Sequence, residues 1–455
     1  MRASVASNIR EDTVVDTSRN CQNEPLLTSK RGRAWLGVIL AALILLKILL
    51  CWLPSDAIDM AGYLAWSQHL ALKDWADFYR TWHVVYGPAY LYLLWISGEI
   101  AAAFGVLGTK AHEILIKLWP VLFDCIGGVL IYRIARKQNR QRLGFWLAIG
   151  YSLNPAVFFN SAVWGQFESV VTTLMLAALD CLIARRKAVA ALLFTLAVLT
   201  KPQAAELAPL VFFLFVLDLS WRELGLAAVG SLAVYTAVVM PFSADRSFFW
   251  LIPHFIKSGG DYPYATANAF NLWTLLGGQT LPDATPFWQL SYAGWGVVLL
   301  AAVVLLAGGV AWVRRNQPFW LFYAAYLLCF GVFLVGTRMH ERYLFPALIF
   351  LTVCLIWERR LAWPLIGLSG VHFANTGYVY LRGWLERDPA ARWLATAGQW
   401  LRAIDPVPVS IWVRPGDPLA HLIAAITCAL FGYSVYWLFQ QHVGSVGDRT
   451  GLSKN

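Results

Sequence analysis

The sequence predicts an all-α, polytopic integral membrane protein with about 12 transmembrane helices. Of its 455 residues, 59% are hydrophobic and only 14% are charged, whereas a soluble domain carries about 25% charged residues. The 23 Trp and 18 Tyr residues suit the membrane–water interfaces, where amphipathic rings collect. The net charge of +10 indicates basic cytoplasmic loops, and we expect no nucleic-acid partner.

The chain divides by composition into a polar start, a long apolar body and a short polar end. Residues 1–33 are polar and mixed in charge, which predicts a disordered cytoplasmic tail rather than a signal peptide. We expect residues 34–360 to form the transmembrane module that carries the site. Residues 361–440 then supply C-terminal transmembrane helices and an external loop, and residues 441–455 a second cytoplasmic tail. The 7 cysteines form no CxxC motif and indicate neither a disulfide framework nor a zinc site.

Segments apolar enough to span the membrane recur along the whole body of the chain. In chain order they are Ala34–Leu53, Glu113–Tyr132, Leu143–Asn160, Val170–Ala184, Val189–Thr200, Ala204–Leu219, Leu224–Pro241, Ser291–Val313, Phe319–Gly336, Tyr343–Trp357, Leu361–Tyr380 and Leu419–Phe439. Alternate links between these spans carry the basic clusters, from Lys30-Arg31 to Arg359-Arg360. The positive-inside rule therefore places those links and both termini in the cytoplasm.

One further apolar segment, Tyr86–Phe104, does not fit this alternation. If it crossed the membrane, every later basic cluster would face outward. We therefore predict a re-entrant or interfacial helix inside the first external loop. The alternative is an ordinary span whose partner is missed.

The opposite face then holds two carboxylates directly after the first span, Asp56 and Asp59. A carboxylate at the outer rim of a membrane cavity can act as a general base if it reaches the proton and its pKa is raised. The simpler interpretation is a pair of solvated loop carboxylates.

Two more external links carry ionisable groups. Trp164, Gln166 and Glu168 place an amide and another carboxylate on the side of Asp59, although an acidic residue is also favoured at a helix N-terminus. Lys201, in Lys201-Pro202-Gln203, breaks the positive-inside pattern, and a lipid phosphate would explain it. A lysine that extends to the interface is the alternative.

A charged cluster joins the Phe319–Gly336 and Tyr343–Trp357 spans on the outer side. Arg338, His340 and Arg342 together suit a phosphate or pyrophosphate, and Glu341 is a candidate orienting partner. A structural Arg–Glu pair is the alternative.

An aromatic and Asn-rich loop, Tyr262–Trp273, is suited to sugar, since rings stack on pyranose faces and the amides of Asn268 and Asn271 can bond hydroxyls. It equally suits an aromatic belt at the interface.

The order of these motifs along the chain is informative. The series is Asp56–Asp59, Val85–Leu94, Lys117 with Asp124, Asn154-Pro155, Trp164–Glu168, Lys201-Pro202-Gln203, Asn268–Trp273 and His340–Tyr343. It resembles the GT-C superfamily of lipid-linked-sugar glycosyltransferases, and most of all glycosyltransferase family 87 and the bacterial relatives of the second GPI mannosyltransferase. The resemblance runs from about Ala34 to Trp357, and its most specific strings are HERY and NAFNLW.

The resemblance implies a GT-C-like bundle, an active site facing the periplasm or lumen, a polyprenyl-phosphate sugar donor with mannose as the first expectation, and an inverting mechanism. It implies that the acidic residue of the first external loop is the catalytic base, which matches Asp59 best and Asp56 second. Family members often have Asp at Glu168, which shifts the carboxylate, and Tyr86-Gly87-Pro88 stands where the family has Tyr-Pro-Pro.

We therefore expect Lys201, Arg338, His340 and Arg342 around the phosphate, because cations stabilise the charge that develops on the leaving group. The residues expected to orient the sugar or the acceptor are Tyr86, Trp164, Gln166, Glu168, Asn268 and Asn271. We expect no metal and no cofactor, since cations already stand where a metal would act.

The expected partners are a polyprenyl-phosphate sugar, membrane lipids, and a glycolipid, glycan or protein acceptor. The short loops favour a bacterial inner membrane, with the site on the periplasmic side. The competing functions are a transporter, a flippase for lipid-linked oligosaccharides, and a polymerase or ligase of lipid-linked glycans. A transporter would bind substrate near the midplane, in repeated halves that this sequence does not show.

Overall fold

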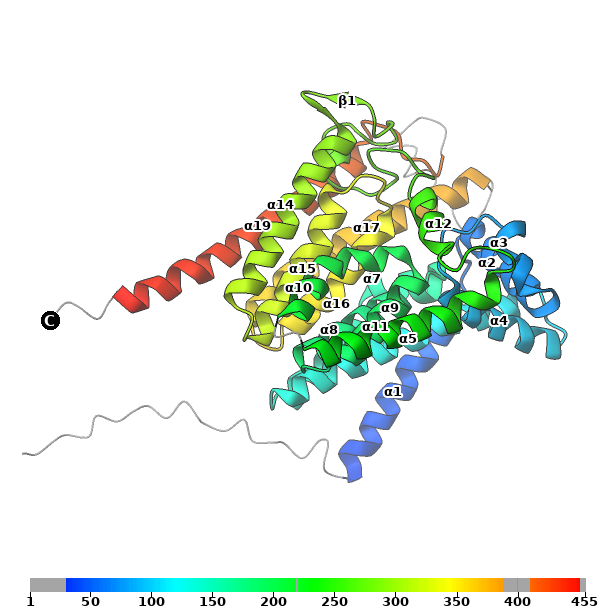
Figure 1. The fold of residues 1–455 in the computed structure, drawn as a ribbon, viewed down its shortest axis with the longest axis horizontal. Helices are drawn as coiled ribbons and strands as arrows, with labels where there is room; N and C mark the ends of the chain where they lie inside the picture. The colour runs from blue at the N-terminus through cyan, green and yellow to red at the C-terminus, as the bar shows by residue number, and fades with distance from the viewer. Residues whose placement is uncertain (1–29, 218–219, 388–398, 400–409, 451–455) are drawn as a thin grey trace, which may run out of the picture. The chain divides into compact units, whose positions relative to one another are not determined.

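The computed structural model describes residues 30–217, 220–387, 399 and 410–450 (Figure 1). The chain divides into two compact units, Met1–Leu45 and Leu46–Asn455. Helix α1 (Lys30–Leu50) crosses the boundary between them, and every candidate site residue belongs to the second unit. Residues on both sides of the sequence-based division at 360 lie within that second unit. Predicted tail residues 1–29 and 451–455 lie outside the described residues.

The first external loop is largely helical. Its elements are α2 (Ala57–Leu72), η1 (Trp75–Asp77), α3 (Phe78–Thr81) and α4 (Pro88–Ala103). Pro88 starts α4 at a position where its missing N–H costs nothing. Helix α4 packs along α2 and also against α5 and α9. The apolar segment Tyr86–Phe104 therefore forms a helix, and its depth in the membrane stays a prediction.

The central part of the unit is a set of helices packed around α8. Its elements are α5 (Lys110–Lys137), α6 (Gln141–Ser152), α7 (Pro155–Phe158), η2 (Phe159–Trp164), α8 (Glu168–Ile183), α9 (Lys187–Thr200), η3 (Pro202–Leu207), α10 (Ala208–Val216), α11 (Trp221–Val239) and η4 (Met240–Phe242). Helix α8 packs against both α5 and α9, and α11 covers α9.

The C-terminal part surrounds α15, a helix that is buried along most of its length. Its elements are α12 (Leu251–Ser258), α13 (Leu272–Leu275), β1 (Pro286–Phe287), β2 (Leu290–Ser291), α14 (Tyr292–Val313), α15 (Pro318–Val335), η5 (Glu341–Leu344), α16 (Phe345–Cys354), η6 (Arg359–Leu361), α17 (Ala362–Arg387) and α19 (Pro418–Thr450). Helix α15 packs against α14, α16 and α19, and α17 packs against α16 and α19. β1 and β2 form a short antiparallel hairpin.

Each predicted span overlaps a described helix, so the prediction of a mostly helical membrane protein is confirmed. Among the described residues, 5 helices are long and apolar enough to cross a membrane: Lys110–Lys137, Trp221–Phe242, Tyr292–Val313, Pro318–Val335 and Pro418–Gln441. Shorter apolar helices are Val38–Leu50, Lys187–Thr200 and Pro202–Val216. The count of about 12 crossings stays a prediction.

Three helices differ from the prediction in where they begin or end, and the first difference has a local reason. The segment Leu143–Asn160 is not one helix, because Asn154 caps a new helix through Ala156 N and Pro155 cannot donate a backbone hydrogen bond. At the other end, α17 continues past Tyr380 to Arg387, and α19 continues past residue 440 to Thr450.

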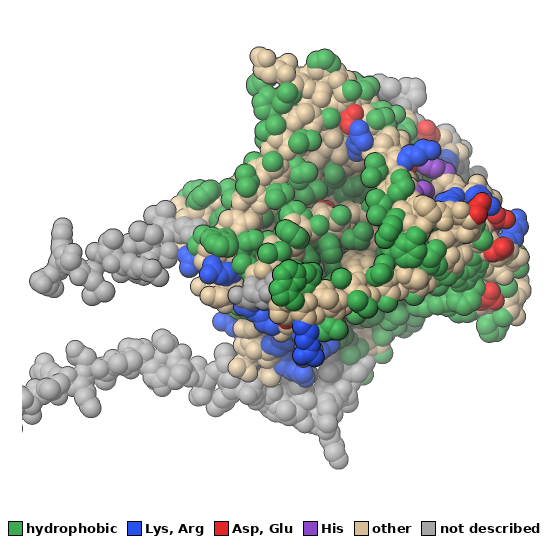
Figure 2. Space-filling model, viewed as in Figure 1, with side chains coloured by type: hydrophobic (Ala, Val, Ile, Leu, Met, Phe, Trp, Pro, Cys, Tyr) green, Lys and Arg blue, Asp and Glu red, His purple; other side chains and the backbone are tan. Residues whose placement is uncertain are grey.

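The two ends of the bundle differ in charge. Acidic, basic and His side chains occur together at the end that holds α2, α3 and α12, whereas Lys and Arg predominate at the end where α5 finishes (Figure 2). Apolar side chains cover the face between the two ends (Figure 2). This distribution agrees with the sidedness derived from the basic links.

Candidate active site

Asp59 is held rigidly at the start of α2. Asp56 caps this helix, and its Oδ1 accepts hydrogen bonds from Ile58 N (3.1 Å) and Asp59 N (3.0 Å). One turn into α2, Asp59 Oδ2 accepts from Trp164 Nε1 at 2.9 Å and from Gln166 Nε2. The Asp59 side chain is half-buried, and its carboxylate is oriented by two of the sequence-predicted residues, Trp164 and Gln166.

The loop that holds Asp59 has an irregular backbone. It follows η2, a π-helix of 6 residues, which is a rare form that often occurs at functional sites. Gly165 then has φ of 91°, a conformation that favours glycine. An added Cβ at Gly165 would lie 2.5 Å from Met60 Cε, so this loop sits directly on α2. Gln166 Oε1 accepts from Tyr63 OH (2.9 Å), which closes the contact back onto α2.

A buried ion-pair cluster lies beside this loop. Glu168, at the N-terminus of α8, accepts a hydrogen bond from Lys201 Nζ, at the end of α9. Arg342 Nε lies 3.6 Å from Glu168 Oε1, and Arg342 Nη1 donates to Glu341 Oε1 at 2.7 Å. Three segments far apart in the sequence therefore meet in one place.

Aromatic rings enclose the Lys201 ammonium. Its Nζ lies 5.7 Å from the ring centre of Tyr86, 5.6 Å from that of Phe167 and 4.7 Å from that of Tyr343. These are cation–π distances, and they stabilise a charge that is removed from water. Gly87 makes this packing possible, because a Cβ there would lie 1.9 Å from Leu199 O. The departure from the family's Tyr-Pro-Pro thus has a steric explanation.

The cluster perturbs the ionisation of its members. Burial lowers the pKa of Lys201, an effect that the charge of Glu168 opposes. For Arg342, burial is outweighed by the charges of Asp59 and Glu341, which hold its pKa well above the usual range. Burial, together with Arg342 and Lys201, holds the pKa of His340 well below its ordinary value. At neutral pH the site therefore contains a guanidinium and a neutral imidazole.

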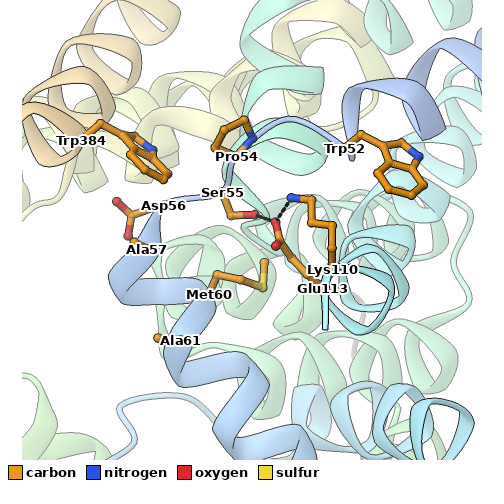
Figure 3. Close-up of a pocket in the computed structure, with 10 residues that line it drawn as sticks. All are labelled: Trp52, Pro54, Ser55, Asp56, Ala57, Met60, Ala61, Lys110, Glu113 and Trp384. Carbon is orange, nitrogen blue, oxygen red and sulfur yellow. Dashed lines mark hydrogen bonds and ion pairs between the residues drawn. The ribbon is translucent and has the colours of Figure 1, made fainter. Parts of the chain in front are cut away.

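Two cavities open beside the Asp59 loop. The first, the Lys201 cavity, has a volume of about 370 Å³. Its lining includes Tyr86, Lys201, Glu206, Arg338, His340 and Tyr343. The second, the Asp56 cavity, has a volume of about 410 Å³ (Figure 3). Its lining includes Trp52, Ser55, Asp56, Met60, Lys110, Glu113 and Trp384. Three of the four predicted phosphate-binding residues, Lys201, Arg338 and His340, thus share one cavity, and the first-loop acid Asp56 lines the other.

Arg338 lies at the edge of the Lys201 cavity with partners of its own. Its side chain is 41% exposed, Nε donates to Asp283 Oδ2 at 2.6 Å, and Nη1 donates to Gly259 O at 2.7 Å. Arg338 is therefore more loosely attached to the site than Arg342.

The predicted sugar contacts Asn268 and Asn271 are engaged within the protein. Asn268 Oδ1 accepts from Gln279 Nε2 and Val413 N, both at 3.0 Å. Asn271 Oδ1 caps α13, and its Nδ2 donates to Phe333 O at 3.0 Å. The backbone of this loop also bridges to His340. Both amides therefore have partners within the protein, and their contact with a sugar stays a prediction.

The candidate residues chosen from the sequence omit several residues that build the site. Tyr63 lies four residues after Asp59 on α2, a helical spacing that could have revealed it. Phe167 and Tyr343 stand inside or beside the chosen motifs, but only the fold brings their rings to Lys201. Glu206 lines the Lys201 cavity without a distinctive sequence signal. Among the described residues, no group of three or more His, Cys, Asp or Glu side chains could hold a metal ion.

Comparison with known proteins places the chain in a family. The model of glycosyltransferase family 87 matches residues 85–337, which is more than half of the chain. No curated protein matches. Among solved structures, ArnT from Cupriavidus metallidurans bound to undecaprenyl phosphate is similar, with 14% identity, a TM-score of 0.50, and coverage of 88% of this chain and 77% of that one. The apo structure of the same protein has the same identity and coverage, with a TM-score of 0.46. At this identity the likeness shows the fold alone. The chain belongs to glycosyltransferase family 87 of the GT-C superfamily, and it is a membrane glycosyltransferase.

Proposed function

We propose that this protein is an inverting glycosyltransferase that moves a sugar from a polyprenyl-phosphate carrier to an acceptor hydroxyl on the extracytoplasmic face. Membership of family 87 supports sugar transfer. ArnT, the protein of similar fold, is bound to undecaprenyl phosphate, and this polyprenyl phosphate supports the same class of carrier here. Mannose remains the first candidate for the sugar, on the resemblance described above.

The observation that carries the proposal is the meeting of Asp59, Lys201 and Arg342. They come from α2, the end of α9 and η5, yet each interacts electrostatically with the others through one buried cluster. A carboxylate beside two cations and a neutral His is what phosphate departure requires, since the cations stabilise the charge that develops as the C–O bond breaks.

The proposed reaction has one step. The acceptor oxygen attacks the anomeric carbon, the bond from that carbon to the phosphate oxygen breaks, and polyprenyl phosphate leaves with the electron pair. Asp59 takes the hydroxyl proton, because its charge acts on both Lys201 and Arg342 and it matches best the base that the resemblance implies. Lys201, Arg342 and His340 surround the leaving phosphate, with Arg338 at the cavity edge. No general acid is needed, and no metal is used.

Gln166 and Trp164 hold the base, because both donate to its Oδ2. Glu168 and Tyr86 hold Lys201. Asn268 and Asn271 hold the loop of His340. In this proposal these residues mainly orient other side chains of the enzyme. The donor sugar occupies the Lys201 cavity beside them.

The test is a donor panel in proteoliposomes that contain the full chain. Radiolabelled polyprenyl-phosphate mannose, glucose, galactose and arabinose are each supplied with membrane lipids. The proposal expects a labelled glycosidic product from at least one donor, with the anomeric configuration opposite to that of the donor. Label that crosses the bilayer without a product would favour a transporter, and retained configuration would exclude direct attack by the acceptor.

A further inference from the structure

The Asp56 cavity contains one unsatisfied buried acceptor. Asp56 is 2% exposed, its Oδ1 is used in capping α2, and its Oδ2 has no hydrogen-bond partner among the described residues. A buried polar atom without a partner costs free energy, which a bound donor would recover. The carboxylate lies beside Trp384, with the Ser55 segment on its other side (Figure 3).

The other charged groups of the cavity, Lys110 and Glu113, are paired. Glu113 accepts hydrogen bonds from Ser55 Oγ and from Lys110 Nζ, the latter at 2.6 Å, and Lys117 Nζ lies 3.1 Å away. Lys110 also donates to Leu53 O at 3.1 Å. The cavity therefore offers a ligand neither a free cation nor a second free anion from this group. The atom that calls for a partner is Asp56 Oδ2, and a neutral O–H donor matches it.

The walls of the cavity are aromatic and firmly held. Trp52 and Trp384 lie at its two ends (Figure 3), and Trp52 is 60% exposed, so that end lies at the surface. Tyr380, one turn before Trp384 on α17, donates to Pro54 O at 2.6 Å and ties this helix to the Asp56 segment. A flat indole and a hydroxyl acceptor side by side suit a sugar ring, whose apolar face stacks while its hydroxyls bond.

The position of the cavity relative to Asp59 agrees with the reaction geometry. Met60, the neighbour of Asp59, lines the Asp56 cavity, while the Asp59 charge acts on Lys201 and Tyr86 of the other cavity. Inversion needs the acceptor and the leaving phosphate on opposite faces of the anomeric carbon. Asp59 lines neither cavity, but its neighbour lines one and its charge acts on residues of the other, so it can serve both if one holds the donor and the other the acceptor.

We propose that the Asp56 cavity binds the acceptor, and that the acceptor is a sugar: one of its hydroxyls donates to Asp56 Oδ2 while its ring stacks on Trp384. The reacting proton goes to Asp59, so Asp56 is a specificity-determining residue and not a second base. The role of this sugar as the acceptor rests on the proposed function. The binding of a sugar at Asp56 does not.

The binding test does not need turnover. Octyl α-mannoside, octyl β-glucoside and octyl β-galactoside, each with a diazirine on the sugar, are photolysed with the reconstituted protein, and the labelled peptides are mapped by mass spectrometry. At least one probe is expected to label the segments around Trp52–Ala61 or Trp384, and Asp56→Asn is expected to reduce that label about tenfold. Asp56→Asn keeps the helix cap, since Asn caps as well as Asp.

The matched controls change a capping Asp and a Trp that lie outside the Asp56 cavity. Asp74→Asn alters the exposed cap of η1, and Trp288→Ala removes an exposed indole from the hairpin, as Trp384→Ala removes one from the cavity. Both controls are expected to label like the natural protein. Labelling in the Lys201 cavity only, labelling unchanged by Asp56→Asn and Trp384→Ala, or competition by a Ser/Thr peptide but not by free sugar would overturn the inference.

Kinetics with the active donor from the panel separates this inference from the proposed function. Asp56→Asn and Trp384→Ala are expected to raise the KM for the sugar acceptor about tenfold while the donor KM stays constant. If no donor gives product but the probes map to the cavity, the proposed function fails and the sugar site stands. If transfer occurs and the acceptor KM is unchanged in both variants, the inference fails alone.

Discussion

Lys201 is the residue whose charge the site controls most tightly. Burial lowers its pKa, so its ammonium loses its proton at a lower pH than that of an exposed lysine. If the charged form holds the donor phosphate, donor binding is complete below that pKa and is lost as the pH rises through it. We expect the donor KM to rise over a pH range that lies below about 10.4, where an exposed lysine titrates.

Lys201→Arg keeps its charge throughout that range, so the rise in donor KM should disappear even if the variant binds less well at pH 7. Lys257→Arg, at an exposed position on α12, is the matched control and should leave the pH profile unchanged. A donor KM that is flat with pH in the natural protein would show that the Lys201 charge is not needed for donor binding.

The two arginines of the charged link differ in their surroundings, so equal substitutions should have unequal effects. Arg342 is nearly buried between Glu168 and Glu341, whereas Arg338 is 41% exposed and pairs with Asp283. We expect Arg342→Lys to lower kcat/KM about 100-fold. Arg338→Lys should lower it only about fivefold, since an exposed pair contributes little. Steady-state assays of the two variants decide this, with thermal melting to show that both fold.

The sequence could not distinguish, among the candidate site residues, those that face a cavity from those that do not. Residue type and spacing show which side chains can bind phosphate or sugar, but not which of them face a cavity. The side-chain amides of Asn268 and Asn271 could bond sugar hydroxyls, but in the structure they bond Val413 N and Phe333 O. Those partners lie 145 and 62 residues away, so no local rule could reveal them.

At the scale of elements, a buried polar cluster joins α1, α5, η2 and α8. Asp124 on α5 pairs with Lys47 of α1 at 2.5 Å and accepts from Ser161 Oγ of η2 at 2.5 Å. Ser169 of α8 also donates to it. Ser161 and Ser169 flank the loop that holds Asp59, so this cluster fixes the ends of that loop.

Removing one member should therefore affect both stability and turnover. Asp124→Asn leaves Lys47 buried without a full counter-charge, which costs about 3–5 kcal/mol, and the melting temperature should fall. In the double variant Lys47→Met with Asp124→Leu the melting temperature should recover, because no unpaired charge remains. Turnover should stay low, because Ser161 and Ser169 still lack their acceptor.

The comparison pair is Lys137 with Asp180, which is exposed on the lysine side and joined at 2.7 Å. Asp180→Asn is expected to change neither the melting temperature nor kcat measurably. Full recovery of turnover in the Lys47–Asp124 double variant would show that the cluster serves folding alone.

The sequence predicts the ends of a helix well where the length of an apolar segment sets them. It predicts them poorly where a capping residue sets them. Long apolar segments such as Ser291–Val313 coincide closely with α14 (Tyr292–Val313). The break at Pro155 and the π-helix η2 depend on side chain–backbone bonds and on the packing of α8 and α2, which periodicity does not report.

At the scale of the whole molecule, the sidedness of the chain decides where chemistry can occur. The positive-inside pattern gathers Asp59, Lys201 and Arg342 on one side, and the structure brings them into one cluster. Helix termini on the same side of a membrane share a thin layer, so the positive-inside pattern could indicate this grouping. The separate Lys201 and Asp56 cavities could not be predicted, because the Asp56 cavity is built from residues far apart in the sequence, such as Pro54 and Trp384.

The central claim is that Asp59 is the base in this cluster, and one variant tests it most directly. Asp59→Asn keeps the size of the side chain and an oxygen for Trp164 and Gln166 to bond, but it cannot take a proton. We measure single-turnover transfer from the active polyprenyl-phosphate sugar, together with donor binding and thermal melting. The account predicts a fold and a donor affinity like those of the natural protein, with a transfer rate at least about 10³-fold lower. A rate near that of the natural protein would contradict it.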